Sequence, residues 1–403
     1  MKILVISASF PPMRTGEAAN AFYLCHHLSS RGFDVHVLTT KTDVLAGRTS
    51  FTLHPIMLNW SWDESPRFVR FLKTCRPDAI LLVYIDFIYN NHPMITFAPS
   101  FSGSVLPSVP FVTRFENPIG IPPSRYSFVT RLLRKVVAWR VGATDISYRF
   151  GSLLRDSHRV IVLSKRHRDA LSSSYPPVNS KTILIPPAPN MLVFPSNNGR
   201  TREEGRRLVG AEGDDFLVVY LGYMYPGKGV ETLLRAIKVL KGERGNVRVV
   251  LMGGSIDSKY GAGRSYVEDM RRLSGELGIS ENMIWTGDYT ADSPKASIYL
   301  HAADVCVLPF DTGVQLNNSS FAAAAAHGLP IVTTEGAFLE EPFVHRENVF
   351  LCPPKDPGRL AAAIETLIEE PELRKRLGGG AEKLAQKWFS WETAIERTIA
   401  TFN

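Results

Sequence analysis

The chain has 403 residues, of which 44% are apolar and 21% are charged, and its formal net charge is +7. This composition is ordinary for a folded globular protein, and it excludes a disordered or collagen-like chain. At about 150 residues per domain, the length predicts two or three domains. The positive charge suits an anionic ligand or surface, but by itself it does not indicate nucleic acid, which we do not expect as a partner.

The cysteines are scattered along the chain and form no CxxC pair: Cys25, Cys75, Cys306 and Cys352. We therefore expect neither a disulfide framework nor a structural zinc site, which fits a reducing compartment. The apolar start, Ile3–Ile6, stops before Pro11 and Pro12 and reads as a buried strand rather than a signal segment. No run of about 18 apolar residues occurs, so we expect a cytoplasmic protein without a membrane-spanning segment.

The first half of the chain alternates short apolar runs with helical patterns, which is typical of a parallel sheet with crossover helices. Predicted strands cover 3–6, 35–38, 79–83, 111–113, 160–163 and 183–185, and predicted helices cover 17–30, 131–143 and 165–173. A stretch rich in Pro and Asn, 186–199, is the best candidate for a linker.

A second series of the same kind follows the linker. Predicted strands cover 216–221, 247–252, 283–286, 305–308 and 331–333, and predicted helices cover 230–240, 264–277, 295–301, 319–327, 357–369, 371–387 and 391–402. Both halves therefore read as doubly wound α/β domains. Such sheets bind ligands at the carboxyl ends of their strands, so we expect a ligand site in a cleft between the two domains.

Three segments carry groups suited to a phosphate-bearing ligand. Gly16 opens the first helix, where backbone N–H groups and the helix dipole attract an anion, although it could serve only as a turn. Lys228, flanked by Gly227 and Gly229 at a helix start, suits a diphosphate, and the alternative is a solvated lysine in a Pro-Gly turn. Asn318–Ser320 opens the alanine-rich helix and combines N-capping with N–H groups that can face a ligand.

The order and spacing of these segments resemble the family 4 glycosyltransferases of the GT-B fold along nearly the whole chain. In the N-terminal half the resemblance rests on Ser9–Pro12, Gly16 and Leu28–Val35. It is stronger in the C-terminal half, where it rests on Gly227–Ala236, Ala303–Pro309, Ala326–Thr334, Glu347–Asn348, Pro353–Asp356 and Phe389–Trp391.

The resemblance implies an α/β protein of the GT-B fold, with two doubly wound Rossmann-like domains facing across a cleft. Residues 1–187 would form the acceptor-side domain, joined by the C-terminal helix 390–403, and residues 200–389 the nucleotide-sugar-binding domain. The implied activity is retaining, metal-independent transfer of a sugar from a nucleotide-diphosphate sugar to a sugar, glycolipid or small-molecule acceptor, without a cofactor. In the absence of a metal, positive charge and helix ends must stabilise the leaving diphosphate.

The resemblance also assigns residues to the site, with no metal ligand among them. The donor-binding candidates are Gly16, Lys228, Gly254, Tyr289, Gln315, Asn318, Ser319 and Ser320. The catalytic candidates are His92, Arg114 and Glu116, with a surface role for His92 and a structural Arg114–Glu116 ion pair as the alternatives.

Several positions depart from the family's pattern. Tyr223 stands where the family usually has arginine, and Gln315 and Ala323 stand where it usually has two glutamates. The strand and loop Val112–Glu116 also lacks the family's acceptor-side histidine. These departures favour, as an alternative, a catalytically silent GT-B subunit that binds a sugar nucleotide or a partner. A sugar-nucleotide epimerase on the same fold fits the motifs less well.

The segment 125–159 is strongly basic and interleaves cations with apolar residues. A helix of this kind can lie on anionic lipid, which would place the protein at the inner face of a membrane. The alternative, which we prefer from the sequence, is an ordinary core-facing helix with a solvated basic face.

Overall fold

The computed structural model describes residues 1–42, 49–119, 126–142, 147, 149–195, 200–242, 246–255, 263–289 and 293–403. Residues 196–199 of the expected linker, and residues 125, 143–146 and 148 of the basic segment 125–159, lie outside this part. The chain forms two compact units. The first unit comprises Met1–Met13, Glu17–Pro186 and Ala394–Asn403, and the second comprises Arg14–Gly16 and Pro187–Thr393.

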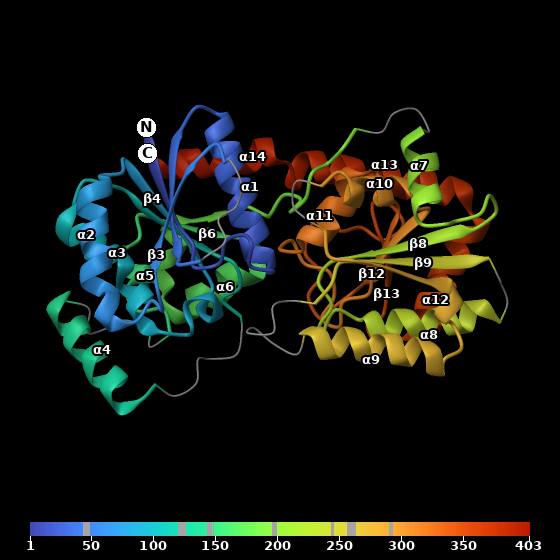
Figure 1. Ribbon diagram of the computed structural model, residues 1–403, viewed down its shortest axis with the longest axis horizontal. Helices are drawn as coiled ribbons and strands as arrows, with labels where there is room; N and C mark the ends of the chain where they lie inside the picture. Colours follow the sequence, from blue (N-terminus) through green and yellow to red (C-terminus); the bar gives the residue numbers. More distant parts are fainter. Residues whose placement is uncertain are drawn as a thin grey trace. The chain divides into compact units, whose positions relative to one another are not determined.

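The first unit is built on a parallel sheet of seven strands within the described residues, in the order β3-β2-β1-β4-β5-β6-β7 (Figure 1). The strands are β1 (Lys2–Ile6), β2 (Asp34–Thr40), β3 (Thr52–Met57), β4 (Ala79–Tyr84), β5 (Phe111–Phe115), β6 (Arg159–Val162) and β7 (Thr182–Leu184). β4 and β5 are buried along their whole length, as expected for strands of a parallel sheet covered on both faces.

Helices lie on both faces of this sheet (Figure 1). The helices of the first unit are α1 (Gly16–Ser30), α2 (Ser65–Cys75), α3 (Ala98–Val105), α5 (Leu153–Asp156), α6 (Lys165–Ser174), at the chain's end α14 (Trp391–Ile399), and α4 (Phe128–Arg140), which lies away from the sheet. Short 3₁₀ turns are η1 (Trp62–Glu64), η2 (Asp86–Tyr89), η3 (Pro93–Phe97), η4 (Pro176–Lys181) and η7 (Ala400–Phe402).

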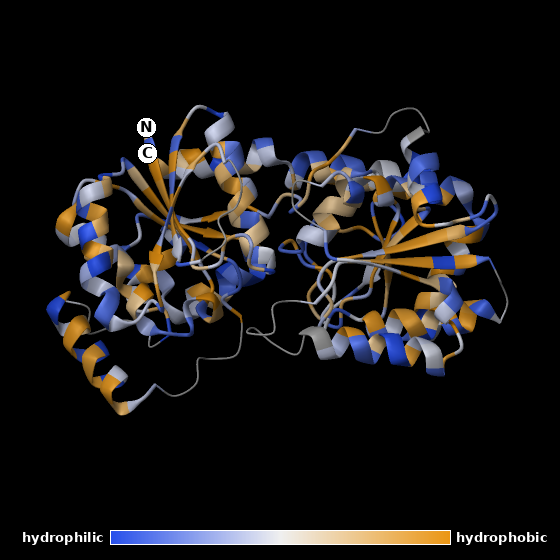
Figure 2. Cartoon of the chain, in the orientation of Figure 1, coloured by the Kyte–Doolittle hydropathy of each residue, from blue (hydrophilic) through white to orange (hydrophobic). Residues whose placement is uncertain are grey.

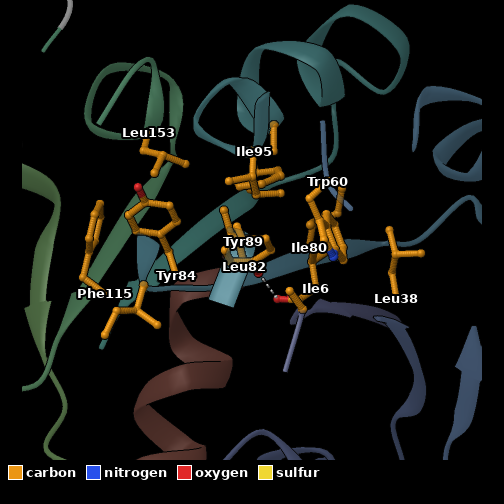
Figure 3. Close-up of a cluster of buried hydrophobic side chains, with 14 of the residues drawn as sticks. Ile6, Leu38, Trp60, Ile80, Leu82, Tyr84, Tyr89, Ile95, Phe115 and Leu153 are labelled. Carbon is orange, nitrogen blue, oxygen red and sulfur yellow. Dashed lines mark hydrogen bonds between the residues drawn. The ribbon is translucent and has the colours of Figure 1, made fainter. Parts of the chain in front are cut away.

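One face of the first sheet packs into an apolar core rich in aromatic side chains (Figure 3). Trp60 and Tyr89 are fully buried there, and their rings meet edge to face with centroids 5.0 Å apart. The Tyr89 hydroxyl donates to the carbonyl oxygens of Val83 at 2.7 Å and Ile6 at 3.4 Å. These bonds satisfy the buried hydroxyl and tie the segment after β4 to the ends of β1 and β4.

Helix α4 departs from both its expected bounds and its expected orientation. It begins three residues before the predicted start and ends at Arg140, and Ala138 is its one buried residue. The interpretation as a core-facing helix is therefore wrong. The helix packs mainly against η3, where the Arg134 guanidinium lies 5.9 Å from the centre of the Phe97 ring, and most of its apolar side chains face outward.

The second unit is built on a parallel sheet of six described strands in the order β10-β9-β8-β11-β12-β13. The strands are β8 (Phe216–Leu221), β9 (Val247–Met252), β10 (Met283–Gly287), β11 (Val305–Leu308), β12 (Ile331–Thr334) and β13 (Phe350–Cys352). The helices are α7 (Arg200–Leu208), α8 (Val230–Lys241), α9 (Gly263–Glu276), α10 (Lys295–Ala302), α11 (Ser319–Ala326), α12 (Pro357–Glu369) and α13 (Pro371–Trp388), and η6 (Ser280–Asn282) is a 3₁₀ turn.

The four cysteines are free thiols buried within these two cores. In the part of the chain that the structure describes, no helix has the length and apolar character needed to cross a bilayer.

Three consecutive glycines in α13 test how closely this helix packs. A Cβ on Gly378 would lie 2.4 Å from the Gly328 carbonyl oxygen, and one on Gly380 would lie 2.2 Å from the Glu347 carbonyl oxygen. Gly379 is exposed and has open space around it. We expect Gly379→Ala to raise the free energy of unfolding by up to ~1 kcal/mol, the usual helix preference for alanine. Gly378→Ala and Gly380→Ala should each lower it by ~1–3 kcal/mol through overpacking. Urea denaturation of the three variants measures these changes, and a shift of the same sign in all three would contradict this packing.

His327 makes the stability of the second unit depend on pH. Its Nδ1 donates to the Ala323 carbonyl at 2.7 Å, and its Nε2 accepts from the Ser297 hydroxyl at 2.6 Å, so the ring is held neutral. Burial lowers the pKa of His327 from 6.5 to about 4. Between pH 6.5 and pH 4 the His327 imidazole is protonated in the unfolded chain but stays neutral in the folded chain. The free energy of unfolding therefore falls as the pH drops towards 4.

At pH 4.5 this histidine should cost ~2 kcal/mol of stability relative to pH 7. Because other buried histidines act in the same direction, the measurement is the difference between the wild type and His327→Asn in urea denaturation at the two pH values. The variant should lose less stability on acidification than the wild type. Equal losses would show that His327 titrates normally in the folded protein.

Candidate active site

The second sheet reverses its strand order between β8 and β11. From β8 the chain builds outward through β9 and β10, then returns to β11 on the other side of β8 and continues through β12 and β13. In open α/β sheets such a reversal leaves a crevice beyond the carboxyl ends of the two strands, where ligands bind. The two loops that border this crevice are 222–229, after β8, and 309–318, after β11.

Glycines line the carboxyl edge of this sheet. Gly222, Gly253 and Gly287 follow or end β8, β9 and β10, and all three have positive φ. The Gly222 N–H donates to Met252 at 2.9 Å and the Gly253 N–H donates to Gly287 at 3.1 Å, so the ladder continues past the strand ends. A row without side chains leaves backbone groups accessible at the edge where a ligand would sit.

The two crevice loops are fixed to each other. The Asp311 N–H donates to the Gly227 carbonyl at 3.0 Å. Gly229 has φ +72° and lies so close to Pro309 that a Cβ would meet the Pro309 carbonyl oxygen at 1.7 Å. Glycine is therefore required at position 229, both for the backbone conformation and for the close approach. Gly229 is also the N-cap of α8, so the same contact sets where that helix begins.

Lys228 is held between aromatic rings from both loops. Its ammonium lies 5.1 Å from the centre of the Tyr225 ring and 5.1 Å from the centre of the Phe310 ring. Among the described residues, no carboxylate lies within 4.0 Å of this ammonium. The nearby Asp311 instead pairs with Lys355 at 3.6 Å. Lys228 is thus a half-buried cation, one residue before the N-cap of α8, that is free to pair with an anion.

The turn before α11 differs from the expected side-chain cap. Asn318 occupies the N-cap position, but its side chain makes no capping hydrogen bond. Its Oδ1 instead accepts from the Gln315 N–H at 2.7 Å, because the turn folds back on itself. As at any helix start, the N–H groups of Ser319 and Ser320 have no acceptor within the helix. Ser320 lies beside Gly222, where a Cβ would come within 3.8 Å of the Ser320 Cβ.

Glu340 holds this turn from a distant part of the chain, and no motif in the sequence marks it. It is 6% exposed, and its Oε2 accepts from the Leu316 N–H at 2.8 Å. The residue follows β12 in a loop without a motif, so only the folded sheet brings it to the β11 loop. Ala323 is buried within α11 and presents no polar group, and Gln315 is half-buried.

Gly254 and Tyr289 lie at the β9–β10 side of the same edge. The space beside Gly254 is filled by the Asp288 carboxylate, 2.1 Å from where a Cβ would stand. The expected close approach of a ligand to Gly254 is therefore blocked by this side chain. Burial raises the pKa of Tyr289, with Tyr223 and Asp288 acting in the same direction, so its hydroxyl stays protonated.

Arg114 and Glu116 form a buried pair in the first unit. Arg114 Nε lies 2.8 Å from Glu116 Oε1, and the two side chains are 3% and 10% exposed. The contact does not have hydrogen-bond geometry, and Arg114 Nη2 has no partner among the described residues. The Glu116 N–H donates to the Tyr84 carbonyl at 2.9 Å, which fixes the end of β5 against β4. The pair keeps unused hydrogen-bonding capacity in a buried position, which a purely structural ion pair would be expected to satisfy.

His92 and Gly16 have different surroundings. His92 is the N-cap of η3, and its Nδ1 accepts from the Met94 N–H at 3.2 Å. Burial lowers its pKa, opposed by Asp63, so the ring is neutral with its proton on Nε2. Gly16 opens α1, with open space where a Cβ would stand.

The described residues thus bring the predicted site residues into two groups. Lys228 and the Gln315–Ser320 turn share the β8–β11 crevice, and Arg114 and Glu116 contact each other in the first unit. His92 instead contacts the Trp62 ring, with the ring centroids 5.6 Å apart. Within the described ranges, no group of three or more His, Cys, Asp or Glu side chains is placed to hold a metal ion.

Comparison with known proteins finds a family model that matches most of the second unit. Residues 201–384 match the family model of the glycosyl transferases group 1. The chain is 27% identical over 226 residues to a D-inositol 3-phosphate glycosyltransferase of Thermomonospora curvata, in an alignment that covers 54% of this chain and 50% of the relative. The chain therefore spans about half the length of this curated relative.

Two solved structures resemble the whole chain. Sucrose-phosphate synthase from Thermosynechococcus elongatus has a TM-score of 0.70 at 19% identity, covering 99% of this chain and 97% of the other. The Anabaena protein HepE, in complex with UDP-glucose, has a TM-score of 0.72 at 17% identity and covers 100% of both chains. These likenesses confirm the expected GT-B fold. The chain therefore has the GT-B fold, and its residues 201–384 match the model of the glycosyl transferases group 1 family.

Proposed function

We propose that the protein is a retaining, metal-independent glycosyltransferase that moves a sugar from a nucleotide-diphosphate sugar to a carbohydrate, lipid-linked or small-molecule acceptor. The observation that carries the proposal is Lys228, a half-buried ammonium without a carboxylate partner among the described residues, at the β8–β11 crevice of a group 1 domain. An anion of the donor would supply the missing counter-charge.

The chemistry requires stabilisation of the leaving group. Breaking the bond between the anomeric carbon and the diphosphate oxygen leaves an additional negative charge on the terminal phosphate of the nucleoside diphosphate. Lys228 would bind this charge through its ammonium, and the N–H groups of Ser319 and Ser320 would bind it at the N-terminus of α11. These donors are fixed before the reaction by the paired loops, so little reorganisation is needed as the charge develops.

The remaining candidates have narrower roles in this proposal. Gln315 would face the transferred sugar, and Tyr289, whose hydroxyl stays protonated, would contact the base. Arg114 and Glu116 would contact the acceptor through the side-chain nitrogen and oxygen atoms that have no hydrogen-bond partner among the described residues. His92 would act as a hydrogen-bond donor through Nε2 rather than as a base, because Nδ1 already accepts from Met94.

The comparisons support a nucleotide-sugar donor without naming it. The structures of HepE contain UDP, UDP with glucose, and UDP-glucose. UDP-glucose is therefore the first donor to test on this protein. The experiment is incubation of the full chain with UDP-glucose and other sugar nucleotides, with and without candidate acceptors and with EDTA present. Release of nucleoside diphosphate and a product with the donor's anomeric configuration, seen by NMR, would support the proposal. Inversion, or loss of activity in EDTA, would contradict the retaining or metal-independent part.

A second candidate function is a sugar-nucleotide-binding subunit that does not transfer. The observation that favours it is Ala323, which is buried in α11 and offers no group for a ribose hydroxyl. Binding of a sugar nucleotide without diphosphate release, with every acceptor tested, would select this alternative.

Removing the Lys228 ammonium should weaken donor binding. Loss of a charge-assisted hydrogen bond is worth ~1.5–3 kcal/mol, so Lys228→Ala should raise the Kd of the donor at least tenfold. The matched control is Lys238→Ala, an exposed lysine on the same helix α8. Isothermal titration calorimetry with the best-binding sugar nucleotide measures both variants. An unchanged Kd for Lys228→Ala would place the diphosphate elsewhere.

Proline at Ser319 tests the backbone contribution of α11. Ser319 is the first helical residue, and Asn318 before it is in the extended region, so proline fits there without distorting the helix. Ser319→Pro removes one N–H and should impair donor binding in a folded protein, whereas Ser319→Ala should be mild. Calorimetry on both variants, with circular dichroism to verify folding, separates the two effects. Full donor affinity in the folded proline variant would exclude this N–H as a phosphate ligand.

A further inference from the structure

Helix α4 exposes an apolar face instead of burying it. Its outward side chains include Phe128, which is 73% exposed, and Trp139, which is 75% exposed. The other exposed apolar residues of the helix are Val129, Leu132, Leu133 and Val136. At about 100° per residue these six side chains fall within roughly 140° of the helix surface. Figure 2 shows apolar colour along the length of α4, which lies at the edge of the first unit in Figure 1.

This face lies opposite the side on which the helix is attached. The attached side carries Ala138, the one buried residue, and Arg134, which contacts the Phe97 ring and donates to the Ser147 carbonyl at 3.0 Å. A soluble helix usually turns its apolar stripe towards the core. Here the polar guanidinium faces inward and the large apolar side chains face outward, so an apolar phase outside the first unit would stabilise the arrangement.

Cations adjoin the apolar face, and the helix contains no acidic residue. Arg131 and Lys135 border one side of the face, Arg140 lies at its C-terminal end, and all three are exposed. Within the described residues, none of these three forms an ion pair with a carboxylate. Aromatic and aliphatic side chains between exposed cations match a surface that is apolar inside and negatively charged at its rim.

We propose that α4 is a membrane-docking element that lies in the interface of a bilayer containing anionic lipid. The apolar face enters the boundary between headgroups and acyl chains, with Trp139 at the level where tryptophan is favoured. Arg131, Lys135 and Arg140 contact the anionic headgroups. A second copy of this chain fits the face less well, because an antiparallel α4–α4 contact would bring these unpaired cations together. The proposal does not depend on the transfer activity proposed above.

The first experiment uses the full chain and vesicles of defined composition. Sedimentation with phosphatidylcholine vesicles containing phosphatidylglycerol should carry the protein down, and high salt should weaken this binding. Vesicles of phosphatidylcholine alone should bind it much more weakly. Equal binding to both vesicle types, or no binding to either, would overturn the proposal.

Two sets of variants assign the binding to α4. Replacing Phe128, Leu132 and Trp139 together by Gln, a good helix former, should lower affinity for anionic vesicles at least tenfold. The control replaces three exposed apolar residues elsewhere by Gln, namely Leu58, Val239 and Phe338, and should bind as the wild type does. Circular dichroism verifies that both are folded, and an unchanged Kd for sugar nucleotide verifies that the donor site is intact.

The second set removes charge. Each cation near an anionic surface contributes about 1 kcal/mol, or about a fivefold change in affinity, so Arg131→Gln with Lys135→Gln should weaken binding roughly 30-fold. The matched control is Arg70→Gln with Lys73→Gln on α2 of the same unit, both exposed. Equal effects of the two pairs would show general charge attraction and overturn the assignment to α4.

Sedimentation equilibrium without lipid tests the second-copy alternative. A dimer that the apolar variants abolish, in a protein that does not bind vesicles, would replace this proposal.

Discussion

The contact between Gly229 and Pro309 determines how the second unit presents its cation. The two loops follow β8 and β11, parallel neighbours from which the sheet extends in opposite directions. They approach so closely that a Cβ at position 229 would clash with the Pro309 carbonyl oxygen. This approach sets the N-cap of α8 and brings the Phe310 ring over Lys228. The hydrogen bond from the Asp311 N–H to the Gly227 carbonyl links the same two loops at a second point. Without this approach of the two loops, Lys228 would be a solvated lysine on a Pro-Gly turn, with no fixed position.

A lysine placed in this way is costly to leave without an anion. Its ammonium has lost part of its hydration to two aromatic rings, whose faces compensate only partly for it. Cation–π contacts hold the ammonium in place without neutralising it. That is the electrostatic state that a site for a phosphate-bearing ligand needs before the ligand arrives, because the positive potential is present and the geometry is fixed.

Much of the fold could be predicted from the sequence because parallel strands buried on both faces are continuous apolar runs. The predicted bounds of β8, β9 and β11 agree with the structure to the residue. β3 was missed because Pro55 interrupts its pattern, and the sheet tolerates this proline because β3 is an edge strand. α3 was missed because Pro, Ser and Gly give it weak helix propensity. The outward orientation of α4 could not be read from periodicity, which locates an apolar face but not what covers it.

The candidate site was predictable where it depends on local sequence. The strand–glycine–lysine–helix order located Lys228 at a helix start, and the loop before the alanine-rich helix located the Asn318–Ser320 turn. The partners supplied by other strands were not predictable. Asp288 filling the space at Gly254 and Glu340 accepting from the Leu316 N–H both depend on tertiary contacts. The Asn318 side chain bonds locally to the Gln315 N–H, where the usual N-cap preference predicts a bond into the helix. The local motifs therefore located Lys228 and the Asn318–Ser320 turn in the sequence, and the folded sheet supplies the contacts that hold the two loops in place.

We propose that the β8–β11 crevice binds a diphosphate through Lys228 and the start of α11. A crystal structure of the full chain with UDP-glucose, or with whichever sugar nucleotide binds best, tests this binding mode most directly. We expect a diphosphate within hydrogen-bond distance of Lys228 Nζ and of the N–H groups of Ser319 or Ser320. A diphosphate bound elsewhere, with the Lys228 ammonium still between the Tyr225 and Phe310 rings and without a ligand oxygen, would contradict it.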